Sequence, residues 1–251
     1  MSKRKFMGLE VVLLAAGFGK RLLPTTASTP KCLISILGKP LLRYWLELLF
    51  QDERVTRVFI NTHYLSDQVE DFINQSTWKD KIEMIYEPVL RGTAGTLGEL
   101  RGLLKSDTVM VAHADNLSRF DLGEFLHAHH SRPPNCLGTM MTFETDSPGS
   151  CGILQLDEAG TVLEMYEKTT GNHGNLANAA VYLFEKEVFE SLGFPDVKEP
   201  DISNHLVPRF LGRLHTWHNT VYHRDIGTPE ALAIAEKEYA SLITCDVQVP
   251  L

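Results

Sequence analysis

Two glycines and two basic residues near the start of the chain have the types and spacing needed to bind a phosphate chain. Gly17 and Gly19 leave the backbone amides of a loop free to approach an anion closely. Arg21 adds a planar fork of hydrogen-bond donors, and Lys31 adds a compact positive charge from a second arm of the loop. This combination is suited to the triphosphate of a nucleotide. The residues expected to line that nucleotide here are Leu14, Ala15, Ala16, Gly17, Gly19 and Lys20.

Two common phosphate-binding motifs do not fit this loop. A dinucleotide fingerprint requires a third glycine where the chain has Leu22, and a P-loop requires Ser or Thr where it has Arg21. The stretch from Gly17 to Lys31 instead resembles the signature of the sugar-1-phosphate nucleotidyltransferases, G-x-G-T-R-L-x-P-x-T-x-x-x-P-K, with Lys20 in the place of the threonine. A glycine turn with solvated lysines is the alternative, and the length of the match argues against it.

Two aspartates follow expected strands and have the character of metal ligands. Asp115 ends an apolar strand in the sequence H-A-D-N, and Asp225 stands in D-I-G-T-P before an expected helix. Mg²⁺ prefers carboxylate and phosphate oxygens, so two aspartates suffice when the substrate supplies the other ligands. The resemblance implies the same pair as Mg²⁺ ligands, although H-A replaces the usual Asn-Gly before Asp115. Helix capping is the alternative for each aspartate.

A third group of residues, later in the chain, has the chemistry of a sugar-phosphate site. Glu167 can accept hydrogen bonds from two hydroxyls, and Lys168 can neutralise a phosphate. Asn178 both donates and accepts, and Gly152 lets the backbone approach a sugar ring. The positions resemble the glycine, E-K and asparagine motifs of the same family, which implies a sugar 1-phosphate site. Solvated charge on a surface strand is the alternative for Glu167 and Lys168.

The segment E-P-V-L-R-G-T-A-G-T, which begins at Glu87, concerns the choice of base. Guanine presents an N–H and an amino group side by side, so one carboxylate accepts both hydrogen bonds, and Glu87 therefore favours guanine. The segment resembles E-x-x-L-G-T-A-G of mannose-1-phosphate guanylyltransferases, with Arg91 in the place of leucine. Gly92, Thr93 and Ala94 are expected to face the nucleotide as well. Uracil and thymine remain open as alternatives.

Taken together, these groups predict an enzyme that transfers a nucleotidyl group, most consistent with GMP from GTP, to a sugar 1-phosphate. The substrate phosphate is already ionised, so positioning and charge neutralisation by Mg²⁺ and the cations replace a general base. Two alternatives stay open: a uridylyl- or thymidylyltransferase acting on a hexose 1-phosphate, and a non-catalytic sugar-nucleotide sensor or regulatory subunit. The catalytic residues expected are Arg21, Lys31, Asp115, Lys168 and Asp225.

Apolar runs alternate with helical segments along the chain and must position these residues. Strands are expected at Val11–Leu14, Val55–Ile60, Ile82–Tyr86, Val109–Ala112, Cys136–Phe143, Gly152–Leu156, Val162–Lys168 and Leu176–Phe184. Helices are expected near Leu41–Phe50, Leu65–Asn74, Thr93–Leu104, Asp121–Ser131 and Thr228–Ala240.

The alternation predicts an α/β fold with a Rossmann-like mixed, mostly parallel sheet flanked by helices, with its ligands outside the carboxyl ends of the strands. The strand-rich second half is expected to extend this sheet in antiparallel fashion over the site. One domain is expected over residues 1–251. The resemblance implies a catalytic domain without the C-terminal β-helix domain of larger relatives.

Composition narrows the class of partner. The chain has 251 residues, 43% of them hydrophobic, which is enough for a large core. Its net charge of −8 argues against nucleic acid as a partner. No apolar run reaches membrane-spanning length, and the basic start M-S-K-R-K is not followed by a cleavage pattern. A cytoplasmic protein with reduced cysteines is therefore expected, without a membrane partner.

Two surface features bear on metal binding and on assembly. His127, His129 and His130 are expected on a solvated helix face, so no histidine metal site is predicted. A homodimer contact is expected at an exposed apolar stripe on the helix Leu41–Phe50 or at the tail Val247–Leu251.

Overall fold

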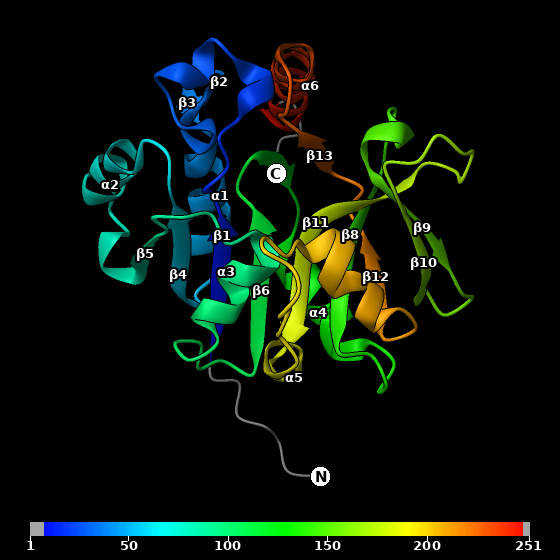
Figure 1. Cartoon of the computed structure of the whole chain (residues 1–251). Helices are drawn as coiled ribbons and strands as arrows, with labels where there is room; N and C mark the ends of the chain where they lie inside the picture. The colour runs from blue at the N-terminus through cyan, green and yellow to red at the C-terminus, as the bar shows by residue number, and fades with distance from the viewer. Residues whose placement is uncertain (1–7, 248–251) are drawn as a thin grey trace.

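The structure, a computed structural model, describes residues 8–247, with side chains described up to residue 244. Its centre is a nine-stranded sheet (Figure 1). The strands of this sheet are β1 (Leu9–Leu14), β4 (Val55–Thr62), β5 (Ile82–Tyr86), β6 (Thr108–His113), β8 (Gly138–Glu144), β9 (Gly152–Leu156), β10 (Val162–Glu167), β11 (Leu176–Glu185) and β12 (Leu214–His218).

The order of the strands confirms the predicted mixed, mostly parallel sheet. Along the main path it is β10-β9-β11-β6-β1-β4-β5; off this path, β8 pairs with β11 and β12 pairs with β8. Strand β1 is parallel to both of its neighbours, β4 and β6. Strands β10 and β11 run opposite to the rest of the sheet, which gives the predicted antiparallel extension. The sheet is therefore parallel from β6 to β5 and antiparallel from β10 to β6.

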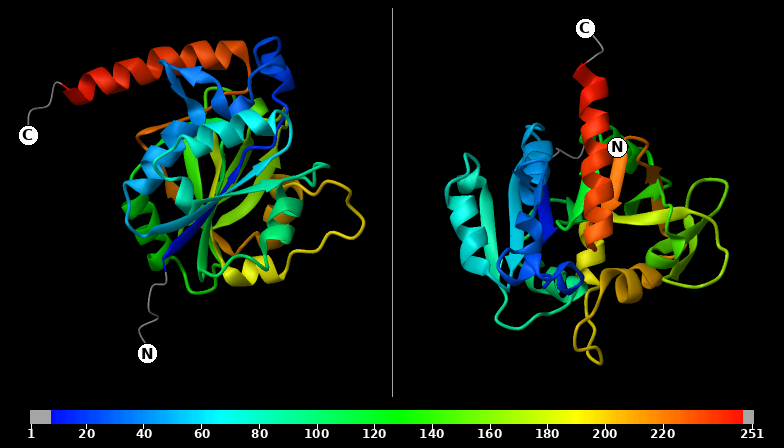
Figure 2. Two further views of the ribbon diagram at one scale, coloured as in Figure 1. Left: turned by 90° about the vertical axis from the view of Figure 1, so that its left-hand side faces the viewer. Right: turned by 90° about the horizontal axis from the view of Figure 1, so that it is seen from above.

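Helices cover both faces of the sheet (Figures 1 and 2). The helices are α1 (Leu41–Phe50), α2 (Ser66–Asn74), α3 (Thr93–Leu100), α4 (Leu122–Ser131), α5 (Lys186–Glu190) and α6 (Pro229–Val247). On β1, Val11 and Leu13 pack on one face with α1, α2 and α4, whereas Val12 and Leu14 pack on the other with α3 and α5. Successive side chains of a strand point to opposite faces, so a fully apolar strand is buried from both sides.

Helix α1 has the predicted bounds, but the expectation of an exposed apolar stripe on it is wrong. Leu42, Trp45, Leu46 and Leu49 are buried in the main core. Their spacing places them on one helix face, and that face is covered by the sheet of the same chain. The other suggested dimer contact, the tail Val247–Leu251, lies outside the side chains that the structure describes.

Helix α4 corrects the expectation for the histidines. His127 and His130 are exposed, but His129 is 0% exposed. Its Nδ1 lies 3.0 Å from Thr139 Oγ1 and its Nε2 lies 3.1 Å from Glu185 Oε1. His129 follows Phe125 by four residues and so shares its buried face, where polar groups of the protein contact both ring nitrogens.

Smaller elements complete the fold. Two two-stranded sheets join β2 (Ser35–Ile36) to β3 (Lys39–Pro40) and β7 (Asn116–Arg119) to β13 (Tyr222–Asp225). The cysteines with described side chains, Cys32, Cys136 and Cys151, are free. Among the described residues, no helix has both the length and the apolarity needed to cross a membrane.

Candidate active site

Parallel pairing of β1 and β6 brings the glycine loop beside Asp115. Leu14 at the end of β1 is in register with His113 at the end of β6. Beyond these strand ends, the amide of Ala114 donates to the carbonyl of Leu14 over 3.0 Å. The loop after β1 and the turn that holds Asp115 therefore emerge side by side at the carboxyl edge of the sheet, where ligands bind in open α/β folds.

Pairing of β7 with β13 brings Asp225 to the same place. Asp225 is in register with Asn116, the residue after Asp115. The amide of Ile226 lies 3.3 Å from the carbonyl oxygen of Asp115. A strand rather than a helix follows Asp115, so Asp115 does not cap a helix. At the start of α6 the amide of Ala231 donates to Thr228 Oγ1, so Thr228 rather than Asp225 caps this helix. The two aspartates are thus paired by the backbone.

Cations bind both carboxylates in this structure. Lys31 Nζ donates to Asp115 Oδ2 over 2.6 Å and lies 3.5 Å from Asp225 Oδ1, and its side chain is 6% exposed. Arg21 Nη2 lies 3.6 Å from Asp225 Oδ2. Burial opposes the charge on Asp115, but Lys31 and His113 hold the pKa of this carboxyl below its ordinary value. Asp115 is therefore an anion at neutral pH.

The glycine loop is held by specific contacts. Gly19 has a φ of 63°, and a Cβ there would lie 2.8 Å from Thr26 Cγ2, so glycine is required. Thr26 Oγ1 donates to the carbonyl of Gly19 over 2.9 Å, and the amide of Ala15 donates to Asn61 Oδ1 over 2.7 Å. Around Gly17 there is open space, so a ligand can approach the backbone closely.

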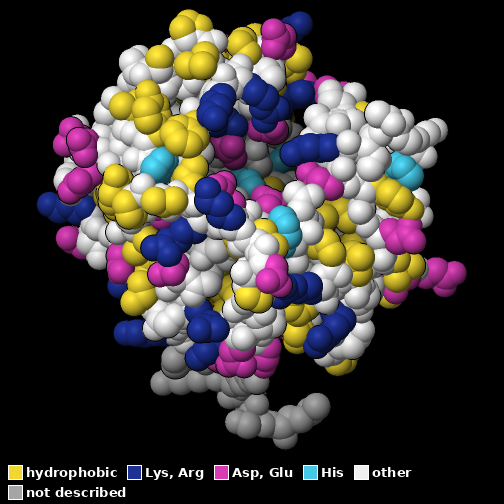
Figure 3. All heavy atoms as spheres, viewed as in Figure 1, with side chains coloured by type: hydrophobic (Ala, Val, Ile, Leu, Met, Phe, Trp, Pro, Cys, Tyr) yellow, Lys and Arg dark blue, Asp and Glu magenta, His cyan; other side chains and the backbone are white. Residues whose placement is uncertain are grey.

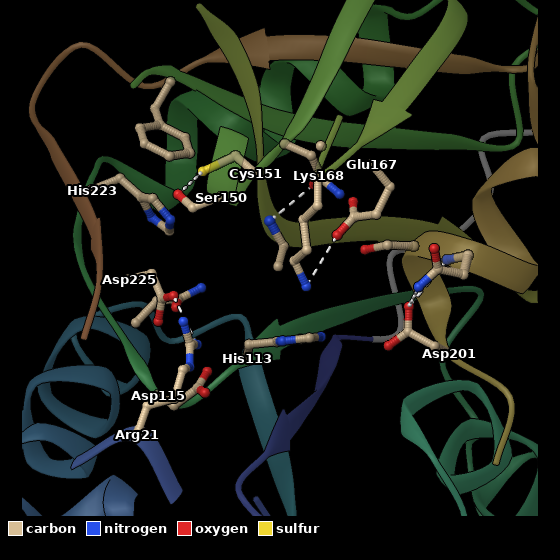
Figure 4. Close-up of a pocket in the computed structure, with 17 residues that line it drawn as sticks. Arg21, His113, Asp115, Ser150, Cys151, Glu167, Lys168, Asp201, His223 and Asp225 are labelled. Carbon is tan, nitrogen blue, oxygen red and sulfur yellow. Dashed lines mark hydrogen bonds and ion pairs between the residues drawn. The ribbon is translucent and has the colours of Figure 1, made fainter. Parts of the chain in front are cut away.

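A cavity of about 200 Å³ opens beside the aspartate pair. Figure 3 shows a hollow on this face, with basic side chains at its rim and acidic and histidine side chains inside it. Figure 4 shows Glu167 and Lys168 pointing into the cavity from the side opposite Asp115 and Arg21. The predicted residues on its wall are Arg21, Asp115, Gly152, Glu167, Lys168, Asn178 and Asp225.

Glycine at position 152 makes room for the neighbouring carboxylate. Gly152 faces Glu167 in the register of β9 and β10, and a Cβ on it would lie 2.6 Å from Glu167 Oε2. Lys168 follows with a φ of 50°, and its Nζ lies 3.4 Å from Glu167 Oε1. Any larger residue at 152 would displace the carboxylate from its position on the cavity wall.

Asn178 is fixed where β11 departs from regular register with β8. The irregularity lies between Asn178 and Tyr182, and Ala180 within it has a φ of 53°. Asn178 Nδ2 donates to the Tyr182 hydroxyl over 2.8 Å, and Asn178 Oδ1 accepts from the amide of Ala180 over 2.9 Å. Its position on the cavity wall is therefore set by contacts within the protein.

Several further polar residues on the wall were not singled out from the sequence. Burial lowers the pKa of His223 to about 3, so this histidine is neutral at ordinary pH. Nε2 of His113 is buried without a hydrogen-bond partner among the described residues. The positions of His113 and Asn116 beside Asp115, and of His223 two residues before Asp225, were signals for these three, whereas nothing local marked the others. The set comprises His113, Asn116, Ser150, Asp201, Ser203, Asn204 and His223.

The start of α3 is joined to the segment before Ile202. Gly92 has a φ of 75°, and a Cβ there would lie 2.5 Å from the carbonyl oxygen of Pro200. The amide of Ala94 donates to that oxygen over 2.9 Å, and Thr93 Oγ1 donates to Asp201 Oδ2 over 3.1 Å. The expected contact of Gly92, Thr93 and Ala94 with a nucleotide stays a prediction.

Glu87 is buried, and both of its carboxylate oxygens accept hydrogen bonds from the protein. The residue is only 2% exposed. Oε1 accepts from Asn61 Nδ2 over 3.0 Å and from Thr96 Oγ1 over 2.6 Å. Oε2 accepts from the amide of Arg91 over 3.2 Å. These bonds connect the ends of β4 and β5 to α3, and the reading of guanine by Glu87 stays a prediction.

Comparison with known families gives a match over most of the chain. A family model described as nucleotidyl transferase matches residues 10–241, which include both aspartates and all of the cavity residues named above. The chain belongs to the nucleotidyl transferase family.

Relatives of this nucleotidyl transferase carry informative names. Mannose-1-phosphate guanylyltransferase of Mycobacterium tuberculosis is 30% identical over 227 residues, which cover 88% of this chain and 62% of that protein. Catalytic subunit beta of the Drosophila melanogaster mannose-1-phosphate guanylyltransferase is 28% identical over 233 residues, covering 89% and 60%. This nucleotidyl transferase therefore spans 62% and 60% of the lengths of these two relatives.

Solved structures share the fold over nearly the whole chain. The crystal structure of HddC from Yersinia pseudotuberculosis is similar with a TM-score of 0.76 and 25% identity, over 92% of this chain and 99% of that one. HddC complexed with GMP-PN gives a TM-score of 0.75 and the same identity and coverage.

The acidic residues of this nucleotidyl transferase fit a hard cation with ligands supplied in part by substrate. The family generally acts with a divalent metal. Within residues 8–247, no group of three or more His, Cys, Asp or Glu could hold a metal ion. Asp115 and Asp225 both approach Lys31 Nζ and present carboxylate oxygens to one point. Phosphate oxygens and water would have to complete such a site.

A Glu87→Gln protein is expected to be less stable by about 1–3 kcal/mol, because an amide places a donor against the donors that now bind the carboxylate. Urea unfolding of the two proteins measures the difference. Glu99→Gln, which alters an exposed carboxylate paired with Arg91, is the matched control and should change stability by less than about 1 kcal/mol. Unchanged stability of Glu87→Gln together with a lost preference for GTP would contradict the structural role and favour base reading.

Proposed function

We propose that this nucleotidyl transferase transfers GMP from GTP to a sugar 1-phosphate and releases pyrophosphate. The observation that carries the proposal is the cavity itself, which is lined by Arg21 and the aspartate pair on one side and by Glu167 and Lys168 on the other. The residues proposed to bind phosphates and those proposed to bind the sugar thus line one cavity of about 200 Å³. The names of the two guanylyltransferase relatives support the same reaction.

The chemistry requires positioning more than proton transfer. The phosphate of a sugar 1-phosphate is ionised at neutral pH and can attack the α-phosphorus of the nucleotide in line. In the proposed reaction Lys168 holds that phosphate and Glu167 accepts sugar hydroxyls, and both residues line the cavity. On the other side, Arg21 and Lys31 are placed to neutralise charge on the nucleotide phosphates.

A divalent cation, proposed as Mg²⁺, would add charge neutralisation on those phosphates when bound. Asp115 and Asp225 would hold it, with the nucleotide supplying further oxygens. The two aspartates are brought together by strand pairing and do not depend on a ligand for their proximity.

Guanine as the base is supported by the names of the relatives and by the complex of HddC with GMP-PN. Glu87 adds no independent support, because both of its oxygens already accept hydrogen bonds from the protein. A uridylyl- or thymidylyltransferase is the second candidate, because Glu87 does not by itself select guanine.

The test is Mg²⁺-dependent release of pyrophosphate with GTP, UTP, dTTP, CTP and ATP, each offered with mannose, glucose, glucosamine and heptose 1-phosphates. Release with GTP, and much less with the other nucleotides, is expected. A preference for UTP or dTTP would keep the reaction but overturn the base assignment. If no combination releases pyrophosphate while a nucleotide sugar still binds in calorimetry, the result favours a non-catalytic sensor or an enzyme for a sugar outside this panel.

A further inference from the structure

We propose that Lys31 is an internal competitor of the divalent cation: it neutralises the Asp115–Asp225 pair in the ligand-free protein and releases the pair when nucleotide phosphates attract its ammonium group. The inference rests on the proposed function and adds a coupling between nucleotide and metal binding. Its basis is that one buried ammonium group lies against both candidate metal ligands.

The geometry places the Lys31 ammonium where a cation would otherwise lie. Nζ is 2.6 Å from Asp115 Oδ2 and 3.5 Å from Asp225 Oδ1. The side chain is 6% exposed, so solvent screens these contacts much less than those of a surface lysine. A divalent ion held by the same two carboxylates would meet this positive charge at short range, and the repulsion must lower its affinity for the ligand-free protein.

The stem of Lys31 also lies against the loop expected to bind phosphate. A Cβ built on Gly19 would be 3.2 Å from Lys31 Cβ and 3.4 Å from Lys31 Cγ, so the glycine backbone and the lysine stem are in contact. A flexible four-carbon stem lets the ammonium turn from the carboxylates toward an anion on that loop without movement of the backbone. The same residue is therefore within reach of both binding partners.

The charges of the two basic side chains balance those of the two aspartates. Lys31 and Arg21 contact the two carboxylates, so two cations face two anions. When a phosphate chain binds the cations, the carboxylates lose their internal partners and gain affinity for a metal ion. Coupling of this kind is reciprocal, so bound metal also raises nucleotide affinity, commonly by about 5- to 150-fold. Nucleotide and metal are then expected to bind as a pair.

The experiment titrates Mn²⁺, followed by electron paramagnetic resonance, into the full chain without any nucleotide or sugar. Lys31→Met is expected to bind Mn²⁺ about tenfold or more tightly than the unaltered protein, because the carboxylates have lost their ammonium partner. Lys31→Arg retains the charge and should stay close to the unaltered protein. Lys20→Met is the matched control: it removes a lysine from the same loop that does not contact the aspartates, and its Mn²⁺ affinity should change by less than about threefold.

Mn²⁺ affinity of a folded Lys31→Met protein that is unchanged or weaker would overturn the inference, as would an equal increase in Lys20→Met. Circular dichroism establishes that each variant is folded. This titration uses no substrate, so it is independent of the proposed reaction. If the unaltered protein is active but Lys31→Met binds Mn²⁺ with unchanged affinity, only this inference is overturned. Tighter Mn²⁺ binding in a protein that releases no pyrophosphate would overturn only the proposed function.

A second measurement uses the unaltered protein and does not depend on the folding of a variant. The ¹⁵N nuclear magnetic resonance signal of the Lys31 ammonium group reports its surroundings. We expect the signal to shift when GTP is added in the presence of a chelator and to stay in place when millimolar Mg²⁺ is added alone. Displacement of the signal by Mg²⁺ alone, or no response to bound GTP, would contradict the exchange of partners.

Discussion

An Asp115→Asn protein is expected to release pyrophosphate about a thousandfold more slowly than the unaltered protein under saturating substrates and Mg²⁺. Asparagine is nearly the same size as aspartate but removes the negative charge that lies 2.6 Å from Lys31 Nζ. With Asp225 as the remaining carboxylate, a divalent cation would be held weakly and out of position. Steady-state kinetics with the best substrate pair from the nucleotide panel gives the comparison.

The control for Asp115→Asn is Asp67→Asn, which removes a carboxylate from the exposed first turn of α2 and should leave turnover within about twofold. Asp115 packs at a partly exposed turn, so Asp115→Asn should still fold, and circular dichroism checks this. A folded Asp115→Asn protein with normal turnover would remove Asp115 from the catalytic residues and with it the proposed metal pair.

Replacement of Arg21 by alanine is expected to reduce turnover about a hundredfold with a smaller effect on folding. The Arg21 side chain is 65% exposed, so its removal leaves no buried cavity. Its guanidinium group stands at the cavity beside Asp225 and presents a planar set of donors to phosphate oxygens. If these donors act on charge that develops in the reaction, the loss should appear mainly in kcat rather than in KM.

Arg21→Lys separates charge from shape. Lysine keeps the positive charge but lacks the planar fork, so partial recovery of turnover is expected. Arg43→Ala, which removes an exposed arginine paired with Glu47 on α1, is the control and should be close to normal. Normal kcat in Arg21→Ala would show that this arginine does not stabilise the reaction, and a change confined to KM would make it a ground-state binding residue.

The local elements of the fold were predictable from sequence periodicity. The bounds of α1 were predicted as observed, and β5 and β9 likewise, because apolar spacing distinguishes a helix from a strand over such lengths. The prediction of helix bounds failed at two ends: α3 ends at Leu100 instead of Leu104, and α6 continues to Val247 instead of ending at Ala240. The strands β7, β12 and β13 were not anticipated, since short segments with few apolar residues carry little signal.

The chemistry of single residues was only partly predictable. Types and order along the chain were sufficient to select Arg21, Asp115 and Lys168, which the structure places on one cavity. Burial was not predictable: His129 was expected in solvent, yet its ring is buried beside Thr139 and Glu185. Glu87 is also buried, with protein donors at both of its carboxylate oxygens, and its contact with the nucleotide stays a prediction. The sequence does not reveal whether the hydrogen-bond partner of a polar side chain is water, a ligand or the protein itself.

By itself, the sequence determined which elements form, which loop has the backbone freedom and charge to hold phosphates, and which family the signature resembles. Only the tertiary structure decided which groups meet. The pairing of β7 with β13 places Asp225 next to Asp115, and the pairing of β1 with β6 places both beside Lys31. Strand register between distant segments depends on the packing of the whole core, so the contact of one lysine with two aspartates could be read only from the folded chain.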